Sequence, residues 1–182
     1  MNEKLTLEQE KELTEKAKTD WSAFEVLYNA YSEEIHYYLM KRLGSKELAE
    51  DITSETFTKA LENIKKFKWK GVPFRAWLYR IAINCANQNY HKSNKEVPID
   101  IDFLAQIKGD DGAKIGEDMD KNAEKEKLKN ALAKLKQKER TIIELRYFQE
   151  LSYEEIAQAM NMTVTLIGVR IHRILKKLQA HI

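Results

Sequence analysis

Cysteine, proline and glycine are all scarce in this chain of 182 residues, which contains one, two and six of them. The single cysteine, Cys85, excludes an internal disulfide and cannot supply a zinc site alone, so a reducing cytoplasm is expected. Because glycine and proline mark most turns, their scarcity favours long helices. No apolar run could span a bilayer, and the first segment, MNEKLTLEQEKE, has no apolar signal core. We therefore predict a cytoplasmic protein without membrane insertion.

Acidic residues are missing from two segments of a chain whose net charge is only +2. Residues 65–95 contain eight Lys and Arg and no Asp or Glu, and residues 161–182 contain four and none. Residues 96–126, between them, contain ten acidic and four basic residues. Basic blocks indicate a polyanionic partner, and acidic blocks keep other surfaces away from it. Chance clustering on a solvated surface is the weaker explanation, because two acid-free segments of this size occur.

The hydrophobic pattern predicts an all-α protein, since helical periodicity dominates and no strand pattern of any length is present. In the first half, one helix is expected to open at Ser22, in the capping-box pattern S-x-x-E with Glu25. After the break LGS a second helix is expected to be capped by Ser45, and a third covers 74–92. In the second half, helices are expected at about 125–136, 138–148, 153–160 and 164–178.

Periodicity fades between about Ser93 and Glu124, where Asp, Gly, Lys and Glu dominate. Such a composition predicts a flexible acidic linker. It could act as a mimic of nucleic acid or as a plain solvated tether, and the sequence leaves these two level. The predicted organisation is thus two small helical lobes, an N-terminal helical bundle and a C-terminal helix-turn-helix domain, joined by this linker, with the boundaries 1–93, 94–124 and 125–182.

The helix FRAWLYRIAINCANQNYHK (74–92) divides into an apolar face and a polar stripe. Arg donates to phosphate, Asn can pair with a base edge, and aromatic rings stack on unpaired bases, so the stripe favours single-stranded DNA. The alternative places Trp77 and Tyr79 in the core and Arg80 in solvent; for Trp77 alone this alternative is at least as good an explanation. The expected core face contains Phe74, Leu78, Ile81 and Cys85, and the stripe contains Arg80, Asn84, Asn87 and His91.

The segment 152–178 has the layout of a helix-turn-helix. Ser152 and Glu155 form a second capping box, Asn161 suits the positive φ of the turn, and Thr163 can cap the second helix. Such a motif reads DNA by placing a helix N-terminus in the major groove. An ordinary helical hairpin is the alternative, which the acid-free second helix disfavours. The expected buried stripe is Ile167, Ile171, Ile174 and Leu178, and the outward side chains are Thr165, Leu166, Val169, Arg170 and Arg173.

Three motifs, in order, resemble bacterial RNA polymerase sigma factors of the extracytoplasmic-function (ECF) type. They are AEDITSETFTKALENIKKF (49–67), FRAWLYRIAIN (74–84) and LKQKERTIIELRYFQELSYEEIAQAMNMTV (135–164). The resemblance implies a transcription initiation factor that binds core RNA polymerase, directs it to specific promoters and supports melting of the −10 element. It implies a region 2-like lobe at 1–93, which binds core polymerase and melted −10 DNA, and a region 4-like lobe at 125–182, which binds duplex −35 DNA. An anti-sigma factor is a further partner implied by the family alone.

The resemblance also implies site residues, and the loop Phe67–Pro73 matches the family's pocket for a flipped-out base. For contact with polymerase the residues are Asp51, Ser54 and Glu55, although a solvated face with an i,i+4 pair Glu55–Lys59 is nearly as good an explanation. For −10 DNA the residues are Trp69, Arg75, Trp77, Arg80, Asn84, Asn87, His91 and Lys92. For −35 DNA they are Thr163, Thr165, Leu166, Val169, Arg170, His172, Arg173 and Lys176.

Two departures from the family leave the promoter sequence open. Gly168 and Val169 stand where a Lys-Ser pair is usual, which removes one contact with phosphate or base. Readout there is expected to shift toward apolar contact of Leu166 or Val169 with thymine methyl groups. The loop KWKGVP (68–73) is bulkier and more basic than the small polar loop of the family.

An enzyme is the first rival, and the sequence disfavours it. GxGxxG, P-loop and nucleophile-elbow motifs are absent, and the four His residues lie on separate elements. DMDKN (118–122) begins like a calcium loop, but Ala123 replaces the required Gly and Lys129 the closing Glu. We therefore expect no catalytic residue, metal or cofactor. A free-standing helix-turn-helix regulator, the second rival, leaves the helix at 74–92 without a role. A pure interaction protein, such as a polymerase decoy, is the third.

Overall fold

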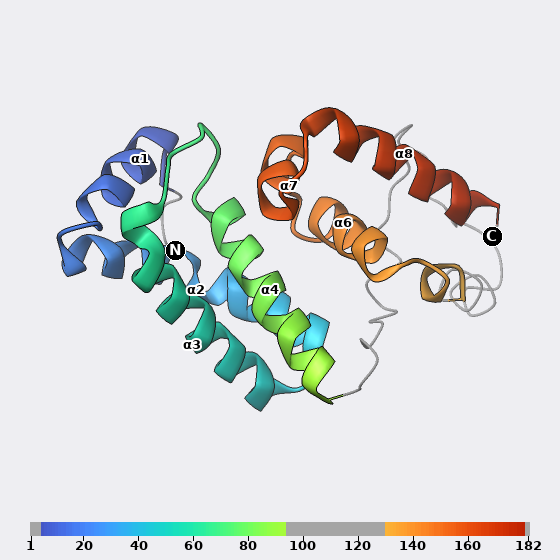
Figure 1. The fold of residues 1–182 in the computed structure, drawn as a ribbon, viewed down its shortest axis with the longest axis horizontal. Coiled ribbons are helices and arrows are strands. Elements are labelled where there is room, and N and C mark those ends of the chain that lie inside the picture. The colour runs from blue at the N-terminus through green and yellow to red at the C-terminus, as the bar shows by residue number, and fades with distance from the viewer. Residues whose placement is uncertain (1–4, 94–129, 181–182) are drawn as a thin grey trace. The chain divides into compact units, whose positions relative to one another are not determined.

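The computed structural model describes residues 5–93 and 130–180, and every regular element in these two ranges is a helix (Figure 1). The chain divides into two compact units, Met1–Pro98 and Ile99–Ile182. The all-α class predicted from the sequence is confirmed. The acidic linker predicted at 94–124 lies outside the described residues, so the boundaries expected around it stay predictions.

The first unit is a bundle built around one long helix. Its elements are α1 (Leu7–Lys16), α2 (Trp21–Leu43), α3 (Lys46–Asn63), the 3-10 turn η1 (Ile64–Lys66) and α4 (Arg75–Ser93). The helix α2 packs against α1, α3 and α4, and α3 lies side by side with α4 (Figure 1). Burial of apolar area is the main stabilising contribution to such a bundle. Its largest fully buried side chains include Leu27, Ile35, Leu39, Phe74, Leu78 and Tyr79.

The starts of these helices correct the sequence prediction at one point and confirm it at another. Asp20, not Ser22, caps α2, because its Oδ1 accepts from the Ser22 backbone N–H at 2.9 Å. The helix therefore begins one residue before Ser22, and the Ser22–Glu25 capping box is wrong. Ser45 caps α3 as predicted, since its Oγ accepts from the Leu48 N–H at 3.3 Å. Gly44 ends α2 with a positive φ of 66°, which glycine adopts readily.

The helix α1 was not expected from the sequence. Thr6 and Gln9 form its capping box: the Gln9 N–H donates to Thr6 Oγ1 at 3.2 Å, and the Thr6 N–H donates to Gln9 Oε1 at 2.9 Å. The local signal T-x-x-Q was therefore present. A helix of ten residues is marginal on its own, so packing against α2 stabilises it.

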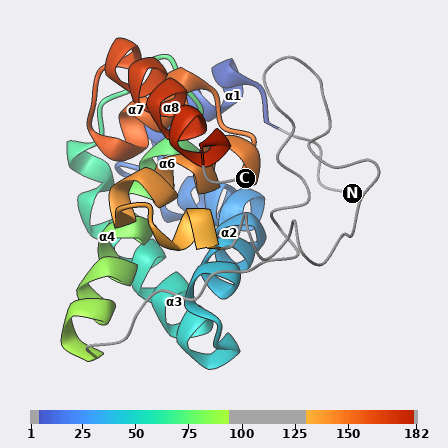
Figure 2. The ribbon, with the colours of Figure 1, turned by 90° about the vertical axis from the view of Figure 1, so that its right-hand side faces the viewer.

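The second unit contains a helix-turn-helix whose turn follows the sequence prediction. Its elements are a helical segment at 130–133, α6 (Gln137–Tyr147), α7 (Tyr153–Met160) and α8 (Val164–Gln179). Figures 1 and 2 show α6 and α7 beside α8. The Ser152–Glu155 capping box is formed, Asn161 has φ 54°, and the Met162 N–H closes the turn onto the Ala157 carbonyl at 2.8 Å. The buried stripe of α8 is the predicted one, Ile167, Ile171, Ile174 and Leu178.

Candidate nucleic-acid interface

A cleft of about 410 Å³ opens between the end of α3, η1 and the middle of α4. We call it the α3–α4 cleft. Two aromatic rings, Phe67 and Trp77, line one part of it. Its lining includes amides and cations from α3, η1 and α4: Lys59, Asn63, Lys66, Arg80, Asn84 and Gln88. Cations can neutralise phosphates, amides can pair with base edges and rings can stack on bases, so this combination fits an unpaired nucleic-acid strand.

The rings of the cleft belong to a larger aromatic cluster that forms the end of the loop before α4. Phe67 and Phe74 are buried, with ring centroids 5.3 Å apart, and Trp77 lies 4.9 Å from Phe67. The ring centroid of Trp69 lies 6.5 Å from that of Phe67. The side chains of Trp69 and Trp77 are both half-buried. Trp77 therefore packs on the core and still presents part of its ring to the cleft. Tyr79, by contrast, is fully buried, which is the alternative that the sequence left open.

The polar stripe predicted on α4 divides between the cleft and the interior. Asn84 is exposed and Arg80 half-buried, and both line the cleft. Asn87 instead meets α2, where its Oδ1 accepts from Nη2 of the buried Arg42 at 3.2 Å. The side chains of His91 and Lys92 lie outside the described residues. A DNA-binding role for each of these residues stays a prediction.

Arg75 has an acidic neighbour although its own segment contains no acid. Its Nη1 lies 3.4 Å from Glu34 Oε1 of α2, and the Tyr79 hydroxyl donates to the same oxygen at 3.0 Å. Burial, followed by the charge of Glu34, raises the pKa of Tyr79, so its hydroxyl stays a donor. The absence of acids between residues 65 and 95 thus does not leave every cation of that segment available to a polyanion.

Three lining residues from α3 and η1 were missed as site residues by the sequence analysis. Lys59, Asn63 and Lys66 follow each other at spacings of four and three, which places them on one face and was a signal that could have found them. Lys59 Nζ pairs with Glu55 at 2.6 Å, as the i,i+4 spacing predicted, and this hydrogen bond raises the pKa of Lys59.

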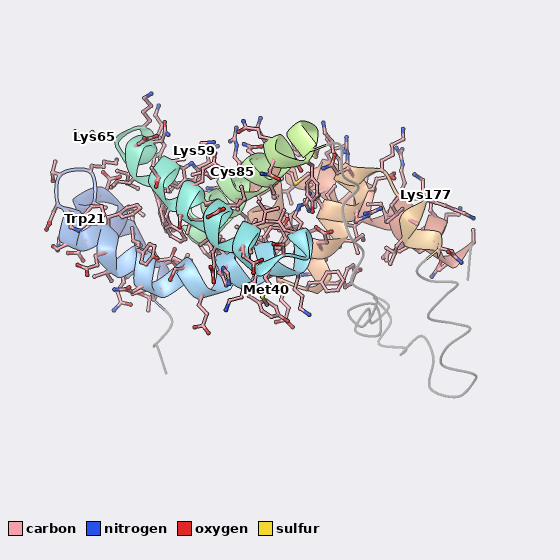
Figure 3. The ribbon with its side chains drawn as sticks, turned by 90° about the horizontal axis from the view of Figure 1, so that it is seen from below. Trp21, Met40, Lys59, Lys65, Cys85 and Lys177 are labelled. Atoms are coloured by element: carbon pink, nitrogen blue, oxygen red, sulfur yellow. The ribbon has the colours of Figure 1, made fainter. Side chains whose placement is uncertain are left out.

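Lys59 also bridges to α4, because its Nζ donates to Gln88 Oε1 at 3.3 Å and contacts Cys85 Sγ at 3.6 Å. Figure 3 shows Lys59 and Cys85 on neighbouring helices. Burial raises the pKa of the Cys85 thiol, which is therefore not an activated thiolate.

The residues implied for polymerase contact lie on the surface of α3. Asp51 and Ser54 are exposed, and Glu55 is half-buried beside Lys59. Their spacings of three and four place them on one face of the helix. The geometry suits both a docking face and the solvated face that the sequence left as an alternative.

The helix α8 exposes an apolar patch at its N-terminal end. Thr163 caps the helix, since its Oγ1 accepts from the Leu166 N–H at 3.3 Å. The large exposed apolar side chains in the described part of the second unit all lie here: Val164, Leu166 and Val169 are 41%, 40% and 42% exposed. Val164 was missed by the sequence analysis. Thr165, within this patch, is exposed; further along, the predicted contact residues His172, Arg173 and Lys176 are exposed, and Arg170 is half-buried.

Gly168 lies on the side of α8 that meets α7. A Cβ atom at this position would lie 3.6 Å from Cε2 of Tyr153, an ordinary contact distance. The Tyr153 ring in turn has the Arg146 guanidinium 5.2 Å from its centroid. A side chain at residue 168 would therefore begin against Tyr153 and not in the open.

Within the described residues, no group of three His, Cys, Asp or Glu side chains could hold a metal ion. None of the helices in the described ranges is long and apolar enough to cross a membrane.

Two protein-family models and several known proteins are similar to this chain. The family model for Sigma-70 region 2 matches residues 27–96, and the model for Sigma-70 region 4 matches residues 125–178. RNA polymerase sigma factor YlaC of Bacillus subtilis (strain 168) is 32% identical over 154 residues, which are 83% of this chain and 87% of that protein. ECF RNA polymerase sigma factor SigW of the same organism is 31% identical over 174 residues, which are 90% of each chain.

Solved structures agree on the fold. CnrH, in its complex with the cytosolic domain of CnrY, matches with a TM-score of 0.60 at 21% identity, over 94% of this chain and 96% of that one. The sigma factor RpoE of Bartonella quintana, in complex with the anti-sigma factor NepR, matches with a TM-score of 0.55 at 22% identity, over 86% and 94%. With both sigma-70 regions present in order and 31–32% identity to relatives over most of their length, the chain belongs to the RNA polymerase sigma factors of the ECF type.

Proposed function

We propose that the chain binds core RNA polymerase through the exposed face of α3, recognises duplex −35 DNA with α8, and holds melted −10 DNA in the α3–α4 cleft. Sigma factors initiate transcription, and family membership supports this role. The observation that carries the −10 assignment is the cleft itself, which joins Arg80 and Lys66, the exposed Asn84 and the edge of Trp77 in one space.

The role is non-catalytic and needs no cofactor, since positioning and strand capture are binding functions. It is exercised in the cytoplasm, where polymerase acts. Regulation by an anti-sigma factor is part of the proposal. The complex of the Bartonella quintana sigma factor RpoE, which has the same fold, with the anti-sigma factor NepR supports it. Acidic residues Asp51 and Glu55, with Ser54 between them, supply the charge that the polymerase face would complement.

Reconstituted transcription tests the proposed function. Core polymerase mixed with this chain should produce transcripts with discrete 5′ ends on genomic templates, and sequencing these ends gives the promoter. Core polymerase alone is the control. Equal, scattered initiation with and without the chain would contradict the proposal, and binding of the chain alone to a specific duplex would favour the free-standing regulator.

The apolar patch on α8 predicts thymine-dependent recognition of the −35 element. Leu166 and Val169 have no hydrogen-bonding group, so in the major groove they can distinguish bases chiefly by contact with the thymine C5-methyl. Burying one methyl group is worth about 0.8 kcal/mol, so replacing a contacted thymine by uracil should weaken binding of the holoenzyme about fourfold. Competition binding with a duplex series, each carrying one uracil, measures this effect.

The matched variants for this measurement are Leu166→Ser and Arg173→Ala. Leu166→Ser should lose the sensitivity to uracil at its thymine, because the contacting methyls are gone. Arg173→Ala should weaken every duplex by a similar factor, as loss of a phosphate contact does. If the affinity of the wild-type holoenzyme is the same for every uracil-containing −35 duplex as for the thymine duplex, readout of thymine methyl groups is refuted.

A further inference from the structure

The buried carboxylate of Glu10 joins three elements of the first unit. Glu10 lies on α1 and is only 3% exposed. Its Oε1 accepts from the Tyr31 hydroxyl of α2 at 2.6 Å, and its Oε2 accepts from the Phe74 backbone N–H at 2.5 Å. Phe74 is 64 residues away in sequence and comes immediately before α4.

The position of the contact at Phe74 makes Glu10 a cap supplied by another helix. The first N–H groups of an α-helix have no partner within the helix, and the Phe74 N–H is at this end of α4. A carboxylate beside it satisfies a donor and is favoured by the positive end of the helix dipole. Local caps come from a residue near the helix start, whereas this one comes from α1, so it ties the loop before α4 to the first helix.

A carboxyl group buried as deeply as that of Glu10 requires that its hydrogen bonds be made. A buried carboxylate is costly unless donors satisfy it. Burial, and next the hydrogen bond to Glu10, raises the pKa of Tyr31, so that the tyrosine remains a donor to the carboxylate. The Tyr31 hydroxyl and the Phe74 N–H, which belong to different parts of the chain, thus both orient the Glu10 side chain.

The ring of Phe74 carries this constraint to the α3–α4 cleft. Its centroid lies 5.3 Å from that of Phe67 and 5.3 Å from that of Trp77, and both of these rings line the cleft. The loop Phe67–Pro73 leads directly to Phe74, so the Glu10 contact fixes the C-terminal end of this loop. Displacing the Phe74 backbone would therefore move the rings and the loop together.

We propose that Glu10 is a positioning residue for the α3–α4 cleft: from α1 it fixes the start of α4 and, through Phe74, the aromatic wall against which an unpaired strand is held. The structural half of this proposal concerns the protein alone. The effect on DNA rests on the proposed function of the cleft.

Hydrogen exchange of the full chain, without DNA or polymerase, tests the structural half. Glu10→Ala removes the acceptor, so amides in residues 67–78 should exchange about tenfold faster or more, while those in the middle of α2 and α3 keep their rates. Glu10→Gln should restore slow exchange, because its carbonyl can accept from Phe74 and its amide can donate to a rotated Tyr31 hydroxyl. Glu8→Ala, at an exposed acid of the same helix, is the control.

Permanganate footprinting with saturating core polymerase tests the effect on DNA. Glu10→Ala should lower −10 melting about tenfold at unchanged core affinity, and Glu10→Gln should melt nearly as wild type does. If Glu10→Ala is too unstable to use, Tyr31→Phe removes one donor to Glu10 and should give a smaller change in the same amides.

The two measurements separate the possible failures. Unchanged exchange at residues 67–78, or equal acceleration throughout α1–α4, overturns the positioning role, whatever the cleft binds. Selective acceleration with normal −10 melting overturns the link to DNA. If Asn84→Ala also melts normally, the proposed function of the cleft fails as well.

Discussion

Promoter binding by the isolated chain should be at least about a hundredfold weaker than binding by its complex with core polymerase. Cations that could meet DNA are divided between the two units: Lys66 and Arg80, for example, line the cleft of the first, and Arg173 and Lys176 lie on α8 of the second. Each set is small, so duplex binding by either should be weak and steeply dependent on salt. Core polymerase would fix the spacing of the two sites and raise the effective concentration of the second.

Gel shifts at physiological salt, with and without core polymerase, measure this difference on one promoter duplex. A scrambled duplex controls for non-specific binding, and a salt titration gives the number of phosphates contacted. Tight, sequence-specific binding by the chain alone would contradict the prediction. A free-standing helix-turn-helix regulator would then be the better explanation.

Asn84→Ala should reduce open complexes about ten- to hundredfold while leaving affinity for core polymerase unchanged. Asn84 is exposed in the α3–α4 cleft, so its removal deletes a donor and an acceptor without opening the core. Asp51→Arg is the reciprocal change. It reverses an exposed charge on α3 and should weaken affinity for core polymerase before it affects −10 melting. Because neither side chain is buried, both variants should fold as the wild type does.

Two assays on each variant separate these effects: fluorescence anisotropy for affinity to core polymerase, and permanganate reactivity for −10 melting at saturating core. Asn87→Ala is a useful comparison, since Asn87 accepts a hydrogen bond from the buried Arg42 and its loss should also lower stability. Normal melting with Asn84→Ala, or equal loss of core affinity in Asn84→Ala and Asp51→Arg, would refute the proposed separation of roles.

Features set by short stretches of sequence could be predicted well. Ser45, Ser152 and Thr163 cap the helices expected of them, and Asn161 takes the positive φ expected at the turn. The Glu55–Lys59 pair forms at the predicted spacing of four. The error at Ser22 is of the same local kind, because Asp20 offered a competing cap two residues earlier. In each case the deciding interaction lies within a few neighbouring residues of the chain.

The family and the helix-turn-helix were likewise determined by the sequence, since ordered motifs and hydrophobic periodicity are properties of the chain itself. The tertiary structure decided which polar residues remain for a ligand. Arg75 meets Glu34, Asn87 meets Arg42 and Phe74 meets Glu10, with partners 41, 45 and 64 residues apart. Helix periodicity gives the face on which a residue lies but not which helix packs against that face. Only packing of α2 against α4, and of α1 against α2, brought these partners together and left Arg80, Asn84 and the edge of Trp77 to the cleft.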